Sequence, residues 1–96
     1  MICWVLYDVH EDTARTKIAK VCKRAGLYRV QKSVFLGTLT ESEKDALMLD
    51  ISDLINEEHD SVYIFPMSKD ELQATALLGQ AFDKRLVTDS VRALFV

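Results

Sequence analysis

The chain opens with an uninterrupted apolar run. This run covers residues 2–7 and stops abruptly at Asp8. A short continuous apolar segment is typical of a strand covered on both faces. A carboxylate at the end of a buried strand is costly unless something nearby uses its charge. Asp8 therefore predicts a metal, a phosphate bound through a metal, or simply the start of the next helix.

A helix is predicted after this strand. Asp12 or Thr13 can cap its start, and Gly26 sits where a left-handed residue would end it. A stripe of apolar residues at helical spacing marks its buried face. The stripe comprises Ala14, Ile18, Val21, Cys22 and Ala25.

Residues 28–36 alternate in a strand-like pattern. The pattern indicates one strand run, which a sharp bend could divide. Neither side of this run is purely apolar, so one side is expected to face a ligand or partner. The first side carries Tyr28, Val30, Lys32, Val34 and Leu36, and the second carries Arg29, Gln31, Ser33 and Phe35.

The second half of the chain predicts another helix and strand. Residues 40–43 form a capping box, and Leu47, Ile51, Leu54 and Ile55 mark the buried helix face. A strand over residues 62–65 is expected to close at Pro66.

The pattern becomes weaker towards the end of the chain. Residues 68–71 can cap one helical turn, and residues 74–78 fit either a strand or a helix. Residues 91–96 read as a terminal strand. Because an uncovered terminal strand leaves a sticky edge, a dimer is expected.

Composition predicts one ordinary globular domain. The 96 residues are 49% hydrophobic and 28% charged, which fits a single compact unit spanning residues 1–96. No basic leader and no membrane-length apolar run are evident, so a cytoplasmic protein is expected. The two cysteines, Cys3 and Cys22, are too few for a zinc motif and are expected to be buried, reduced thiols.

The charge is strongly polarised along the chain, although its net value is only −3. Residues 13–40 hold seven of the twelve Lys and Arg residues and no acid, so this window carries +7 and the remainder carries −10. On the first helix, Lys17, Lys20 and Arg24, with Lys23 further round, form a basic ridge suited to phosphate contacts. The alternative is an ordinary solvated helix face.

The polar residues after the first strand offer further chemistry. His10 could act as a general base near neutral pH. Asp12 is better explained as the helix cap and Glu11 as a first-turn charge, while His59 is expected to close the second helix. Asp8 could also pair simply with Arg15 or with backbone amides. Tyr7 and Phe35 could stack on a base, but strand aromatics more commonly pack in a core or dimer interface.

Several of these features together resemble the Cas-two family, small proteins of CRISPR spacer acquisition that carry an endoribonuclease designation. The resemblance rests on five features: Tyr7-Asp8, then Arg15 and Lys17, then Gly26, the stretch 29–35, and the stretch 60–64. It implies an α+β fold, a ferredoxin-like βαββαβ sandwich with an extra C-terminal strand, dimerising through the sheet. Residues 28–39 would then have to supply two strands, and residues 80–96 would pack on the partner subunit.

The resemblance also implies functional residues. Asp8 from both subunits would share a divalent metal, Mg²⁺ or Mn²⁺. The implied catalytic set is Asp8, Tyr7, Arg15, Arg29 and Phe35. The residues expected to bind nucleic acid are Arg15, Lys17, Lys20, Lys23, Arg24 and Lys32.

The implied partners are the Cas-one integrase, which the homodimer would bridge, duplex DNA and single-stranded RNA. Two departures from the family pattern stand out: Lys17 replaces a more usual Arg, and Leu36 replaces an acid. Two other functions remain open, since the fold permits a toxin-like messenger-RNA nuclease or a metabolite-binding regulatory module.

Overall fold

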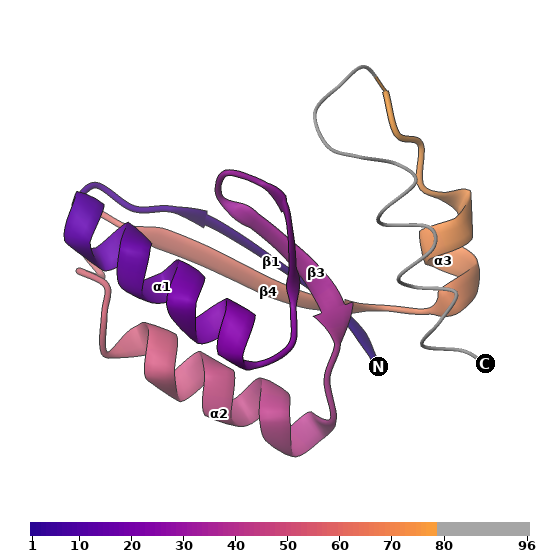
Figure 1. Cartoon of the computed structure of the whole chain (residues 1–96), viewed down its shortest axis with the longest axis horizontal. Helices are drawn as coiled ribbons and strands as arrows, with labels where there is room; N and C mark the ends of the chain where they lie inside the picture. The colour runs from indigo at the N-terminus through magenta and orange to yellow at the C-terminus, as the bar shows by residue number, and fades with distance from the viewer. Residues whose placement is uncertain (79–96) are drawn as a thin grey trace.

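The computed structural model describes residues 1–78, which form an α+β fold of four strands and three helices (Figure 1). The elements are β1 (Ile2–Asp8), α1 (Asp12–Arg24), β2 (Tyr28–Gln31), β3 (Val34–Thr38), α2 (Glu41–Ser52), β4 (Ser61–Met67) and α3 (Lys69–Ala74). Residues 75–78 are neither strand nor helix. The expected terminal strand over 91–96, and the packing of 80–96 on a partner, lie outside the described residues.

The four strands form one antiparallel sheet in the order β2-β3-β1-β4. This order and the βαββαβ succession confirm the α+β, ferredoxin-like part of the expected fold class. Central β1 pairs with β3 from Ile2↔Thr38 to Leu6↔Val34, and with β4 from Ile2↔Met67 to Asp8↔Ser61. Helices α1 and α2 lie together on one face of the sheet (Figure 1).

Strand β1 is covered on both faces, as its apolar run predicts. On the helix side, Cys3, Val5 and Tyr7 pack with residues such as Ile18 and Phe35. On the other side lies a smaller cluster to which Leu72 of α3 adds partial cover. This cluster contains Ile2, Trp4, Val30 and Leu36.

Both cysteines are buried and free, as predicted. Burial raises the pKa of the Cys22 thiol to about 12 and also raises that of Cys3. Since the thiolate is the reactive form, these residues act as core side chains.

The predicted cap of α1 is wrong, whereas its predicted end is confirmed. Glu11 is the N-cap residue and makes no side-chain capping bond, so neither Asp12 nor Thr13 takes that position. Asp12 instead lies in the first turn, where its charge suits the helix dipole. At the other end Gly26 has φ +88°, and the Leu27 N–H donates to the Cys22 carbonyl at 3.1 Å in a Schellman-type closure.

The expectation of one run over residues 28–36 is wrong. The chain reverses at Lys32-Ser33 to form an antiparallel β2–β3 hairpin. Its register shifts between Arg29 and Gln31, where β2 has one more residue than the opposing part of β3, as in a β-bulge. The two strands that the resemblance requires are therefore present.

Helix α2 begins at the predicted capping box but ends early. Thr40 Oγ1 accepts the Glu43 N–H at 3.1 Å, and Glu43 Oε1 accepts the Thr40 N–H at 2.9 Å. The helix stops at Ser52, so the partly buried Leu54 and Ile55 pack on the core from beyond its end. His59 lies in the loop before β4 and does not close α2, contrary to prediction.

Strand β4 continues through Pro66 to Met67, so its predicted closure at Pro66 is wrong. Within the described sheet β4 is an edge strand. Its outer side has no neighbouring strand to hydrogen-bond, so a proline, which lacks an N–H, is tolerated there. The capping box at Ser68 and Glu71 then starts the six-residue α3, which confirms the short helical turn expected there.

Candidate nucleic-acid and metal site

Asp8 is exposed at the end of β1. It is therefore not the buried acid that the sequence suggests, because β1 carries its last side chain clear of the core. Across from it on β4 is Ser61. Within residues 1–78 its carboxylate makes no hydrogen bond or ion pair, so the alternative pairing with Arg15 does not form.

A surface hollow of about 500 Å³ lies beside Asp8. All four strands and the β2–β3 turn contribute to its walls, which combine apolar and polar side chains. We call it the Asp8 hollow. Its lining residues are Leu6, Tyr7, Asp8, Gln31, Lys32, Ser33, Val34, Ser61 and Tyr63.

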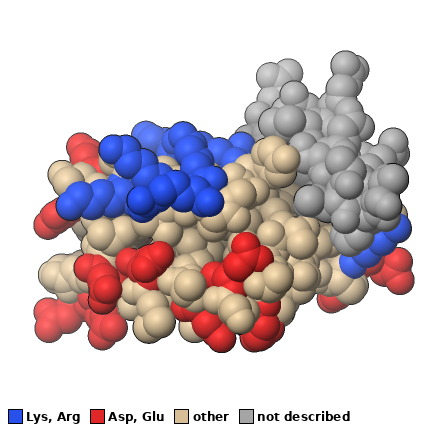
Figure 2. Space-filling model, turned by 60° about the horizontal axis from the view of Figure 1, so that its bottom comes forward, with Lys and Arg blue, Asp and Glu red and all other residues tan. Residues whose placement is uncertain are grey.

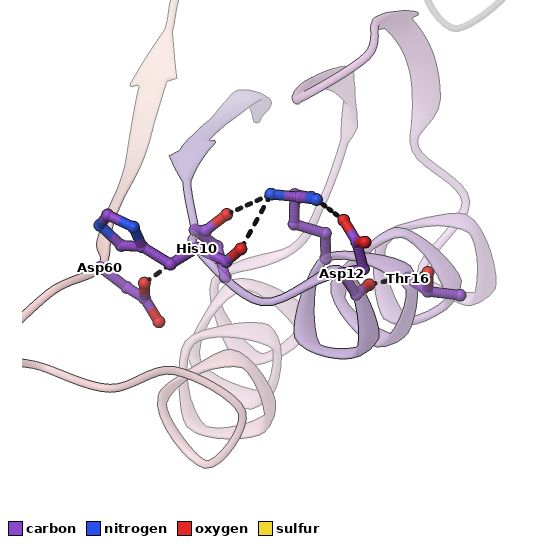
Figure 3. Close-up of polar contacts among 6 residues, drawn as sticks. His10, Asp12, Thr16 and Asp60 are labelled. Atoms are coloured by element: carbon purple, nitrogen blue, oxygen red, sulfur yellow. Dashed lines mark hydrogen bonds and ion pairs between the residues drawn. The ribbon is translucent and has the colours of Figure 1, made fainter.

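Arg15 is committed to the loop that follows Asp8 (Figure 3). Its Nη1 donates to the carbonyls of Val9 at 2.8 Å and His10 at 3.2 Å, and its Nη2 pairs with the Asp12 carboxylate. This arrangement holds the guanidinium against the backbone, so Arg15 stabilises the β1–α1 connection.

Tyr7, Arg29 and Phe35 lie together and meet at the β2–β3 turn. Arg29 donates to the Lys32 carbonyl through Nε at 3.1 Å and Nη2 at 2.7 Å, and its guanidinium lies 5.6 Å from the Phe35 ring centre. The Tyr7 hydroxyl reaches the same carbonyl at 3.4 Å, and its ring stacks on Phe35. Burial raises the pKa of the Tyr7 phenol, which therefore remains a protonated donor. This unit fixes the turn that carries Lys32.

The basic ridge is exposed along α1. Lys17, Lys20, Lys23 and Arg24 all reach solvent, and Figure 2 shows the band of Lys and Arg with carboxylates gathered below it. Lys32 is also exposed, on the β2–β3 turn beside the Asp8 hollow.

One residue of this region was missed by sequence reasoning, namely Asp60. Its Oδ1 accepts the His10 N–H at 3.0 Å, and its Oδ2 accepts the Asn56 N–H at 2.9 Å. The rings of His10 and His59 meet edge to face beside it, with 6.0 Å between centres. The two amides hold the pKa of Asp60 below its usual range. In the sequence Asp60 begins the stretch 60–64 that contributes to the family resemblance, but nothing there indicates its hydrogen-bond partners.

The described part of a single chain contains no cluster of three or more His, Cys, Asp or Glu side chains that could hold a metal ion. Asp8 nevertheless suits a hard divalent cation, because Mg²⁺ binds carboxylate oxygens one or two at a time and keeps its other positions for water and phosphate. Among residues 1–78, Asp8 is the only carboxylate that lines the Asp8 hollow. No helix in residues 1–78 has the length and apolar character needed to cross a bilayer.

The four-stranded antiparallel sheet and its two covering helices define a small ferredoxin-like protein with an exposed aspartate at the end of its central first strand. Residues 1–75 match the family model described as CRISPR associated protein Cas2. The chain belongs to the Cas2 family, as the sequence resemblance predicts.

Individual relatives agree with this assignment. A CRISPR-associated endoribonuclease Cas2 from Chloroflexus aurantiacus is 31% identical over 83 residues, covering 86% of this chain and 98% of the relative. One from Archaeoglobus fulgidus is 31% identical over 67 residues, covering 70% of this chain and 71% of its own.

Solved structures show the same fold. Streptococcus pyogenes Cas2 superimposes with a TM-score of 0.68 at 28% identity, covering 82% of this chain and all of that one. A hypothetical protein from Thermus thermophilus gives a TM-score of 0.70 at 32% identity, covering 81% of this chain and 89% of that one. These matches give no support to a metabolite-binding module or a toxin-like nuclease.

Proposed function

We propose that this protein is a cytoplasmic CRISPR adaptation protein whose homodimer binds duplex DNA and bridges Cas-one integrase subunits. The observation that carries the binding role is the exposed basic ridge on α1. Family membership supports the adaptation role and the integrase as partner.

The ridge suits sequence-independent phosphate binding. Its four cations lie on one helix, and Figure 2 shows the band of Lys and Arg above most of the carboxylates visible in that view. Their side chains can each neutralise a phosphate and release its counterions, which makes affinity strongly dependent on salt. Separation of positive from negative surface also steers a polyanion to this side.

Neutralising two ridge residues tests this role. In the variant Lys17→Gln/Lys20→Gln, duplex affinity should fall. The negative slope of log affinity against log salt should become shallower by about 1.8, because two phosphate contacts are lost. Fluorescence anisotropy of a labelled duplex at several salt concentrations measures both quantities.

A matched control is Lys44→Gln/Lys69→Gln, which removes the same charge from α2 and α3. This control should keep the wild-type slope. Equal losses in the two variants would show that net charge alone, and not the ridge, governs binding.

The dimer is proposed to form through the sheet face opposite α1 and α2. Leu6, Val34, Tyr63 and Phe65 lie on the part of this face that runs towards the Asp8 hollow, and we call this set the open face. Tyr63 is 64% exposed and Phe65 is 38% exposed, which is unusual for aromatic residues at the centre of a strand. A second copy packed here would bury them and bring its own Asp8 towards the first.

A second function, metal-dependent endonuclease activity, is favoured by the unpaired Asp8 carboxylate beside this face. Asp8 from each chain would hold one divalent cation, Mg²⁺ or Mn²⁺. A cation held there by the Asp8 carboxylates would supply Lewis-acid polarisation of a phosphodiester and a coordinated water of lowered pKa. The relatives from Archaeoglobus fulgidus and Chloroflexus aurantiacus are named CRISPR-associated endoribonuclease Cas2, which supports RNA as a substrate.

The surrounding residues have distinct parts in this proposal. Lys32 at the hollow would attract the phosphate, and the unit of Tyr7, Arg29 and Phe35 would hold the turn that presents it. Arg15 would keep the loop after Asp8 in place through its two carbonyl contacts. Of the residues that the resemblance implicates in catalysis, Asp8 is therefore the proposed metal ligand, and the others support it.

Asp8→Asn separates cleavage from binding. Cleavage of labelled single-stranded RNA in Mg²⁺ should be lost in this variant, as it should in wild type with chelator, because a neutral amide is a poor ligand for a hard cation. Duplex affinity should be unchanged, since the ridge is intact. RNA cleavage by Asp8→Asn at the wild-type rate would refute the nuclease proposal.

A further inference from the structure

We infer that Asp60 is a positioning residue for Asp8, an inference that rests on the metal role proposed for Asp8. Asp60 directly precedes Ser61, the residue paired with Asp8 across the β1–β4 ladder. It therefore lies at the same end of the sheet, one residue from the position opposite the proposed ligand.

The two oxygens of Asp60 join two separate loops. Oδ1 accepts the N–H of His10, two residues after Asp8, and Oδ2 accepts the N–H of Asn56 in the α2–β4 connection (Figure 3 shows the His10 contact). The contacts measure 3.0 and 2.9 Å, as expected for charge-assisted bonds to backbone amides. One carboxylate thus ties the segment that carries Asp8 to a loop fifty residues away.

Arg15 holds the same segment from the other side. Its guanidinium binds the carbonyls of Val9 and His10, while Asp60 binds the His10 amide. Two side chains of opposite charge therefore hold the backbone of this loop: Asp60 accepts from its N–H group, and Arg15 donates to its carbonyls. We call Asp60 and Arg15, with this loop, the loop clasp.

Asp8 itself has nothing else to orient it. Its carboxylate is exposed and without a partner among residues 1–78, so its direction depends on the backbone on either side. A metal ligand must be held to within about 0.5 Å, by supporting groups that do not touch the ion. Pairing with β4 fixes the backbone before and at Asp8, and the loop clasp fixes the backbone after it.

The test compares Asp60→Ala and Asp60→Asn with wild type. Isothermal titration with Mn²⁺ gives the metal affinity, and amide hydrogen exchange gives the protection of His10 and Asn56. Asp60→Ala should lose protection at both amides, and its Mn²⁺ affinity should fall about tenfold, the lower end of the range for residues that support a ligand. Asp60→Asn keeps one acceptor oxygen, so its Mn²⁺ affinity and its amide protection should lie between those of Asp60→Ala and wild type.

Glu57→Ala is the matched control. It removes an exposed carboxylate from the same loop, and no hydrogen bond or ion pair of Glu57 occurs among the described residues. Its affinity and exchange should equal those of wild type. The milder Asp60→Asn keeps the test informative if Asp60→Ala does not fold.

Three results would count against the inference. Wild-type Mn²⁺ affinity in both Asp60 variants would overturn it and leave the metal role of Asp8 standing. An equal loss in Glu57→Ala would overturn it in the same way, because loop charge would then explain the effect. Failure of wild type to bind Mn²⁺ would instead refute the metal site itself, and this inference with it.

Discussion

At the scale of single residues, the Lys32 carbonyl is the point on which several predicted site residues converge. It accepts two bonds from Arg29 and a longer one from Tyr7, and both side chains pack on Phe35. Tyr7, Arg29 and Phe35, which the resemblance connects with catalysis, are thus in contact with one another or with the same carbonyl. Their effect on activity would pass through the shape of the β2–β3 turn.

Arg29 should matter more to this turn than the Tyr7 hydroxyl. Arg29→Lys cannot keep both bonds to the Lys32 carbonyl and replaces the guanidinium beside the Phe35 ring, so we expect a loss of about 1–2 kcal/mol in unfolding free energy. Tyr7→Phe removes only a 3.4 Å contact and should cost about 0.5 kcal/mol or less. Urea denaturation measures both, and a larger cost for Tyr7→Phe would contradict this ranking.

Sequence reasoning located some of these residues and missed others for a clear reason. Asp8 stands out because an apolar run ends on it, and its exposure could not be read from that run. Asp60 gives no such signal, because its partners are backbone amides, one of them fifty residues away. Backbone groups occur at every position, so the pattern of side chains does not reveal which amide an acid will bind.

At the scale of elements, helix ends were predicted where the residue type itself marks the cap, either through a capping side chain or through the tolerance of glycine for a positive φ. Gly26 and the capping boxes at Thr40 and Ser68 were found in this way. The β2–β3 hairpin was not, because its Lys32-Ser33 turn contains none of the Gly, Asn or Pro residues that usually mark a reversal. The single apolar alternation across it therefore reads as one strand.

The capping box of α2 should make the stability of the protein depend on pH. The Thr40 amide and hydroxyl hold the pKa of Glu43 below its usual range. A lowered folded-state pKa stabilises the fold above the unfolded-state pKa, and this stabilisation is lost as the pH falls through the folded-state value. Glu43→Gln should therefore melt below wild type at pH 7.

The same comparison in acid provides the check. As the pH falls through the lowered pKa of Glu43 and its carboxylate becomes protonated, the melting temperatures of wild type and Glu43→Gln should converge. Calorimetry between pH 7 and pH 3 follows the difference. A gap that stays constant across this range would show that the Glu43 charge contributes nothing to the cap.

At the scale of the whole molecule, charge and apolar surface are separated. The basic ridge lies on α1, acids gather below it in the view of Figure 2, and the open face lies on the other side of the sheet. The polarised charge was visible in the sequence because residues 13–40 contain no acid. The open face was not, because it combines residues from three strands whose order only the fold reveals.

The central claim is that two chains meet through the open face and share one metal ion between their Asp8 carboxylates. The stoichiometry of Mn²⁺ binding, measured by titration on protein whose mass is checked by sedimentation, tests it most directly. We predict a dimer with one Mn²⁺ per two chains, no binding by Asp8→Asn dimers, and no binding by Tyr63→Glu, which should be monomeric because it places a charge in the interface. One Mn²⁺ bound per monomer, or undiminished binding by Asp8→Asn, would contradict the account.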